Sequence, residues 1–182
     1  MASVSPPLDA VVNELVAHPV RTDEVRTQAP AASGLYAWWA PPAILPEAVG
    51  PAHPTVPDLR LLYVGLTKTK LRSRLALNHL RRSGSSTLRR TLVGLLLDEH
   101  GYRTRWTDRV VLVAEDEARL TEWMRTNLLV SWCEHPTPGD VESDLIRALC
   151  PPLNIKHASG PALQLTMAAR QRYNDSAGPP AG

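Results

Sequence analysis

The sequence predicts a small α/β (α+β) fold, in which a central sheet of about three strands carries helices on both sides. Three short apolar segments are typical of buried strands, and they lie at residues 34–39, 60–65 and 128–133. Segments with apolar residues at helical spacing lie before, between and after them. With 43% hydrophobic residues, the 182-residue chain can form a core.

The helical segments follow from periodicity and from their end signals. They are expected at residues 6–18, 70–82, 86–100, 115–126 and 140–149. Ser86 or Thr87 can cap the third of them, and Gly101 ends it. A short apolar stretch at 110–113 is a further strand candidate. The stretch 40–58 contains six prolines and no periodicity, so we expect a long loop there, suited to substrate or partner specificity.

These elements suggest three parts of the chain. We expect an N-terminal helical extension over residues 1–30, a central domain over 31–160, and a C-terminal tail over 161–182. The last eight or so residues of the tail are rich in Ala, Pro and Gly, which favours disorder.

Several classes of protein are disfavoured by composition. We find no apolar run of about 18 residues and no signal segment, so neither a membrane span nor secretion is expected. The two cysteines, Cys133 and Cys150, do not form a disulfide framework, which makes a reduced, cytoplasmic location the default. There is no Gly-rich phosphate loop and no nucleophile turn. A zinc site built from Cys133, His135, Cys150 and His157 has unsuitable spacing.

The net charge of +2 conceals a basic middle section between Arg60 and Arg105, where only Asp98 and Glu99 are acidic. Such a section is typical of a surface that binds polyanions, because neutralising phosphates is the sequence-independent part of nucleic-acid binding. A solvated helix face is the other interpretation of the same charges.

Five motifs occur in a fixed order. Gly34-Leu35-Tyr36 and Tyr63-Val64-Gly65 lie in the first two strand segments, a basic helix follows, and Glu142 and Pro151-Pro152-Leu153-Asn154 come later. In this order they resemble the motifs of the GIY-YIG endonuclease superfamily. The resemblance implies an antiparallel sheet that carries both tyrosines, and one active site that cuts one DNA strand at a time. Cutting both strands would then require a homodimer or two successive nicks.

The resemblance also assigns roles to individual residues. Tyr36 matches the tyrosine that acts as general base or orients water, and Tyr63 matches the second tyrosine of the site. Glu142 matches the glutamate that holds Mg²⁺ or Mn²⁺, ions that bind scissile oxygens directly. Asn154 matches an asparagine that braces the site. DNA is the expected partner, and no small-molecule cofactor is expected.

The phosphate-clamping arginine and its histidine are less simply assigned. Leu71-Arg72-Ser73-Arg74 reproduces the family's Leu-x-x-Arg pattern, which favours Arg74. In the family a histidine is expected four residues after this arginine, whereas His79 comes five residues after Arg74. In a regular α-helix this places His79 about 140° away from Arg74. Three interpretations stay open: Arg72 is the clamp, Asn78 replaces the histidine, or the helix is irregular.

Further basic residues are expected to contact the nucleic acid. Four arginines surround the break at Ser83–Ser86, where a helix N-terminus adds backbone N–H groups. The expected set is Lys70, Arg72, Arg81, Arg82, Arg89 and Arg90. The rival hypothesis is a nucleic-acid-binding or interaction protein on the same fold that has weak or no cleavage activity.

Overall fold

The computed structural model of the chain describes residues 7–179, and it confirms the predicted α/β class with an antiparallel sheet between helices. The main sheet has four strands in the order β1-β6-β2-β3, instead of the predicted three. Its strands are β1 (Val20–Arg21), β2 (Gly34–Ala40), β3 (Arg60–Thr67) and β6 (Leu129–Glu134). The additional strand, β1, was missed because two residues are too few to show an alternating pattern.

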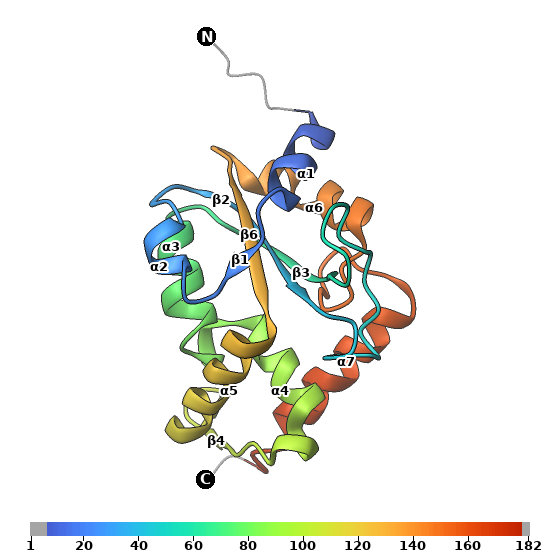
Figure 1. Cartoon of the computed structure of the whole chain (residues 1–182). Helices are drawn as coiled ribbons and strands as arrows, with labels where there is room; N and C mark the ends of the chain where they lie inside the picture. Colours follow the sequence, from blue (N-terminus) through green and yellow to red (C-terminus); the bar gives the residue numbers. More distant parts are fainter. Residues whose placement is uncertain (1–6, 180–182) are drawn as a thin grey trace.

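Helices cover both faces of this sheet (Figure 1). The α-helices are α1 (Leu8–Val16), α2 (Val25–Gln28), α3 (Leu71–Ser73), α4 (Thr87–His100), α5 (Ala114–Asn127), α6 (Pro138–Leu149) and α7 (Gly160–Asp175). A π-helical turn, η1 (Arg74–His79), continues α3, and a 3₁₀ turn, η2 (Ser83–Ser85), precedes α4. The predicted strand at 110–113 forms a separate antiparallel pair, β4 (Thr104–Trp106) with β5 (Val110–Leu112).

The central strand β2 is buried on both faces, and each face contributes to a different core. Tyr36 and Trp38 belong to the core formed with α3, α4, α5 and α7, whereas Leu35 and Trp39 belong to the core formed with α1 and α6. Alternation of side chains along a strand places these two pairs on opposite faces. The candidate site described below lies on the Tyr36 side.

The C-terminal segment differs from the expected tail. Residues 160–175 form α7, and a Cβ at Gly94 of α4 would overlap the backbone of Ala169, so the two helices are in close contact. The hydroxyl of Tyr173 donates to the carbonyl of Val110 at 2.8 Å. Beyond the helix, Trp106 Nε1 donates to the carbonyl of Gly178 at 2.6 Å. The expected disorder of the chain end stays a prediction, and residues 180–182 lie outside the described part.

The loop of residues 40–58 packs onto the domain. Leu45, Ala48 and His53 are buried, and His53 Nε2 lies 2.8 Å from the carbonyl oxygen of Val16 at the end of α1. The role of this loop in specificity stays a prediction, as does the division of the chain at residues 30 and 160. Within residues 7–179, no helix has the length and apolar character needed to cross a bilayer.

Candidate active site

Gly34 and Gly65 allow close packing of the strands and side chains around Tyr36. A Cβ at Gly34 would overlap the carbonyl oxygen of Cys133 on β6, so glycine permits the close approach of these strands. Gly65 lies opposite Tyr36 in the β2–β3 register. A Cβ at Gly65 would lie 2.5 Å from the Tyr36 hydroxyl oxygen and 2.6 Å from Cζ, so the tyrosine ring occupies the space above this glycine.

The Tyr36 hydroxyl is the centre of a buried hydrogen-bond network. Arg74 Nε donates to it at 3.1 Å, and His79 Nε2 lies 2.7 Å from it. Arg74 Nη1 also donates to the carbonyl of Ser85 at 3.0 Å, which fixes the guanidinium beside the loop before α4. Tyr36 and His79 are 1% and 0% exposed, so this arrangement is determined by the protein interior.

The π-helical turn explains how Arg74 and His79 reach the same hydroxyl. Leu80 N donates to the carbonyl of Leu75 at 3.0 Å, an i to i+5 bond that widens the turn between Arg74 and His79. The extra residue returns His79 to the face of Arg74. Of the three interpretations left open, the irregular helix is the one observed. Arg72 instead donates from Nε to the carbonyl of Ala29 at 2.8 Å.

Ser86 connects His79 to the start of α4. Its Oγ caps α4 by accepting from Arg89 N at 3.1 Å, and it lies 2.7 Å from His79 Nδ1. Ser86 is fully buried, and these are its side-chain partners within the described residues. Neutral His79 therefore donates from one ring nitrogen and accepts at the other, bridging Ser86 and Tyr36.

The charge states of this network follow from burial. Burial, assisted by the nearby charges of Arg74 and Arg89, lowers the pKa of His79 well below its usual range, so His79 is neutral. Burial and then Tyr63 raise the pKa of Tyr36, while Arg74 lowers it. Tyr36 is thus a protonated phenol whose oxygen accepts an N–H from the Arg74 guanidinium. Such a donor favours its phenolate form.

Tyr63 lies beside Tyr36 on the same face of the sheet. The two rings are stacked with centroids 6.5 Å apart, and the Tyr63 hydroxyl lies 3.2 Å from Thr87 Oγ1 at the start of α4. Burial raises the pKa of Tyr63 as well. The Tyr63 hydroxyl therefore points toward the N-terminus of α4, whereas the Tyr36 hydroxyl contacts Arg74 and His79.

Asn154 forms hydrogen bonds with the backbone of the edge strand β3 next to Tyr63. Its Oδ1 accepts from Val64 N at 2.9 Å, and its Nδ2 donates to the Val64 carbonyl at 2.8 Å. The adjacent Leu153 N donates to the carbonyl of Leu62 at 2.9 Å. Because β3 is the last strand of the sheet, these bonds satisfy backbone groups that would otherwise lack a partner.

Glu142 approaches the tyrosines from α6. Its charge raises the pKa of both Tyr36 and Tyr63, after the larger effect of burial. Its side chain is 17% exposed and forms an ion pair with Lys156 Nζ at 3.3 Å. The network, Tyr63 and Glu142 together constitute the candidate site.

The candidate site offers one carboxylate to a metal ion. Within residues 7–179 there is no group of three or more His, Cys, Asp or Glu side chains that could hold a metal. One carboxylate is sufficient for Mg²⁺, which keeps several water ligands and takes others from substrate phosphates. Glu142, whose side chain is 17% exposed, fits such an ion.

The basic residues expected in one patch lie in different surroundings. Lys70, Arg72, Arg81 and Arg82 are exposed. Arg89 is a correction, because its side chain is fully buried and pairs with Glu117 at 2.8 Å. Its Nη1 also donates to the carbonyl of His79 at 3.1 Å, so Arg89 supports the network and is inaccessible to phosphate. Arg90 is half-buried on α4, three residues after Thr87.

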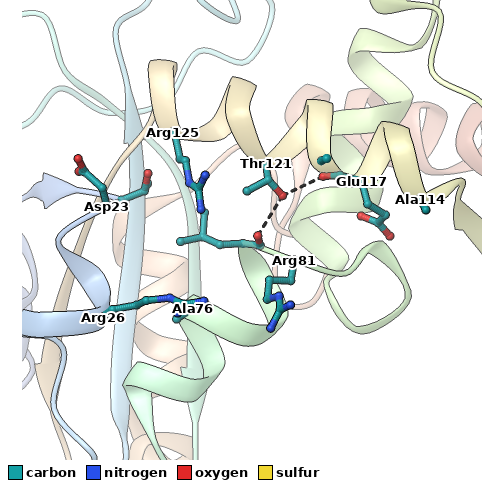
Figure 2. Close-up of a pocket in the computed structure, with 11 residues that line it drawn as sticks. Asp23, Arg26, Ala76, Arg81, Ala114, Glu117, Thr121 and Arg125 are labelled. Atoms are coloured by element: carbon teal, nitrogen blue, oxygen red, sulfur yellow. Dashed lines mark hydrogen bonds between the residues drawn. The ribbon is translucent and has the colours of Figure 1, made fainter.

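Arg81 lines a cavity that is separate from the tyrosines. Figure 2 shows this cavity, which has a volume of about 610 Å³, between η1 and α5. Arg26 and Arg125 also line it, as does Glu117, whereas Tyr36, Tyr63 and Glu142 do not. The cavity is therefore not part of the candidate site.

Three contributors to the site were not assigned from the sequence: Ser86 as the partner of His79, Thr87 as the partner of Tyr63, and Lys156 as the partner of Glu142. Ser86 and Thr87 were recognised only as candidate helix caps. Their position at the start of α4, directly after the residues that interrupt the helical pattern, was the available signal in the sequence. No pattern in the sequence relates Lys156 to Glu142.

The sheet, the flanking helices and the tyrosine-centred network are those of a small nuclease-type catalytic domain. The family model described as GIY-YIG catalytic domain matches residues 34–172, which is most of the chain. The chain belongs to this family, whose members are generally endonucleases. Comparisons with curated proteins and with solved structures gave no match.

Proposed function

We propose that the protein is a metal-dependent endonuclease that hydrolyses phosphodiester bonds of DNA through one active site per chain. The observation that carries this proposal is the Tyr36 hydroxyl, which accepts from Arg74 Nε at 3.1 Å and lies 2.7 Å from His79 Nε2, in the field of Glu142. A pure binding surface has no use for a buried phenol held in this way.

Tyr36 is the proposed general base. Its hydroxyl would first lose its proton to solvent, helped by the neighbouring Arg74 guanidinium, and the phenolate would then accept a proton from the attacking water as the water oxygen bonds to phosphorus. The bond between phosphorus and the 3′ oxygen breaks, and the departing oxygen takes a proton from solvent water. Tyr63 and Thr87 offer hydroxyl groups that orient the water or the phosphate. Asn154 holds the β3 backbone beside Tyr63, and it is proposed as a positioning residue.

Arg74 is the proposed phosphate clamp. Nε and Nη1 are engaged by Tyr36 and the Ser85 carbonyl, which leaves Nη2 to bind a phosphate oxygen. Glu142 would hold Mg²⁺ or Mn²⁺. When bound, the ion would neutralise charge on the scissile phosphate and its leaving oxygen.

The alternative is a nucleic-acid-binding protein without cleavage, and one observation favours it. Lys156 pairs with Glu142, the carboxylate that a metal ion would need. The pair is mostly exposed on the lysine side, and exposed pairs are weak, so a divalent ion can displace Lys156. The enzymatic proposal is therefore preferred.

The test is divalent-ion-dependent nicking of duplex, nicked and branched DNA. Glu142→Gln keeps the shape of the side chain and removes its charge, so it should reduce cleavage by about 100-fold or more while DNA binding persists. Asp144→Asn, on the same helix and paired with Arg147, is the matched control and should leave cleavage unchanged. Cleavage unaffected by Glu142→Gln would refute the site, and binding without cleavage under all conditions would favour the alternative.

A further inference from the structure

Two arginine side chains, one from α4 and one from α7, have no hydrogen-bond or ion-pair partner within residues 7–179. Buried Nε atoms of Arg90 and Arg170 make no hydrogen bond, and neither guanidinium has an ion-pair partner within residues 7–179. Both side chains are half-buried, so the outer N–H groups of each guanidinium are open to a ligand although Nε is not. Two cations placed together without a carboxylate indicate an anion.

The helix packing places these arginines together. α4 and α7 cross where a Cβ at Gly94 would overlap the backbone of Ala169. Arg90 is four residues before Gly94 and therefore on the same face of α4. Arg170 directly follows Ala169. Burial, and then the charge of Arg90, lowers the pKa of Arg170, as expected for neighbouring cations.

The same packing relates the pair to the candidate site. Thr166 Oγ1 donates to the carbonyl of Pro152 at 2.7 Å, next to the segment that holds β3. Arg170 is one helical turn after Thr166 on the same face. On α4, Arg90 is three residues after Thr87, which contacts the Tyr63 hydroxyl.

We propose that Arg90 and Arg170 bind a backbone phosphate of the DNA strand next to the scissile one, so that α7 is part of the substrate-binding surface. This inference rests on the proposed function. Arginine suits the task because its planar fork can contact two phosphate oxygens. The strand then runs from Tyr63 across the start of α4 to α7.

The test is DNA binding by the full chain with EDTA present, which separates binding from cleavage. A short labelled duplex is titrated at several NaCl concentrations with the wild type, Arg90→Gln, Arg170→Gln and the double variant. Each single change should weaken binding by about tenfold. Each should also lower the slope of log K against log salt by about one. The double variant should lower the slope by about two.

Arg172→Gln is the matched control, since Arg172 lies on α7 but pairs with Asp98. It should bind as the wild type does. Arg170→Lys keeps the charge and should keep the salt slope, which separates charge loss from misfolding; unchanged melting temperatures complete that check. An Arg170→Gln protein with unchanged affinity and slope would overturn the inference while the nuclease proposal stands.

Other outcomes of these assays distinguish the phosphate site from the nuclease proposal. Arginine-dependent binding by a protein that never cleaves would support the phosphate site and refute the nuclease. A wild type that does not bind DNA would refute both. Micromolar binding of inorganic phosphate at this pair, without effect on the duplex, would assign the site to a free anion and overturn the inference.

Discussion

The hydroxyl oxygen of Tyr36 and Nε2 of His79 lie 2.7 Å apart, although regular helical geometry would turn His79 away from Arg74 and from the sheet. The π-helical turn over residues 74–79 absorbs one residue and brings both side chains to Tyr36. Single π-turns of this kind frequently occur at functional sites. The irregularity of the helix is therefore what completes the network.

Deleting Leu77 should preserve the network. Leu77 is 46% exposed, and its removal converts the i to i+5 bond from Leu80 to Leu75 into an ordinary α-helical bond. The histidine then follows Arg74 by four residues and stays on its face. We expect cleavage within about fivefold of the wild type and unchanged or raised thermal stability, measured by nicking assay and calorimetry.

The matched control inserts one alanine after Leu77. This insertion moves the histidine a further 100° or so around the helix, so the Tyr36 contact is lost and cleavage should fall by about 100-fold. Equal effects of the deletion and the insertion would contradict the importance of the face shared by Arg74 and His79.

Stability should depend on pH through His79. Its pKa is lowered by burial in the folded state, so below about pH 6.5 the unfolded chain binds a proton that the native protein does not. The free energy of unfolding should therefore fall with decreasing pH, by up to about 1.4 kcal/mol per pH unit from this group, and be unaffected by it above pH 6.5. Denaturant titrations of the wild type and His79→Gln at several pH values test this. Parallel pH profiles of the two proteins would contradict it.

The regular elements of the fold could be predicted because local patterns determine them. The apolar runs of β2, β3 and β6 follow from burial, and α4 begins at Thr87 after the Ser86 cap and ends before Gly101, which has φ 59°. The order of motifs also indicated the family. Strand β1 was missed because its pairing with β6 is tertiary and involves two residues.

The remaining differences arise from three-dimensional packing. Nothing local distinguishes Arg89, whose guanidinium is buried, from Arg82, whose side chain is exposed; only the position of Glu117 on α5 explains the difference. Likewise, α7 has a weakly amphipathic sequence, and its place is set by its contact with Gly94. The π-turn depends on Tyr36 and Ser86 holding His79 from outside the helix.

Gly65→Ala should disrupt the site more than the sheet. The new methyl would lie 2.5 Å from the Tyr36 hydroxyl, so the ring must shift away from Arg74 and His79. We expect a loss of about 1–3 kcal/mol in unfolding free energy and a large loss of cleavage. Gly139→Ala is the control, because its Cβ would meet only the end of the Lys68 side chain at 3.6 Å. Wild-type activity in Gly65→Ala would show that the position of Tyr36 is not critical.

Lys156→Gln should strengthen the binding of a divalent ion at Glu142. Lys156 Nζ lies 3.3 Å from the Glu142 carboxylate and competes with a cation for it. Because the lysine is exposed, the expected gain in affinity is small, about two- to fivefold. Mn²⁺ binding measured by paramagnetic resonance tests this directly. Arg147→Gln, which frees Asp144 on the same helix, should leave it unchanged. Weaker Mn²⁺ binding in Lys156→Gln would contradict a competition between Lys156 and the ion for Glu142.

Arg89 should matter for stability and not for contact with DNA. Its guanidinium is 0% exposed and bonded to Glu117 and to the carbonyl of His79, so Arg89→Met leaves Glu117 without its buried partner. Breaking a buried pair from one side costs about 3–5 kcal/mol, and we expect that loss in denaturant unfolding. Adding Glu117→Gln should recover part of it, because the unpaired charge is removed.

The salt slope of DNA binding should stay at the wild-type value in the Arg89 variant and fall in Arg82→Gln, whose stability should not change. A reduced slope with intact stability in Arg89→Met would restore Arg89 to the DNA-binding surface.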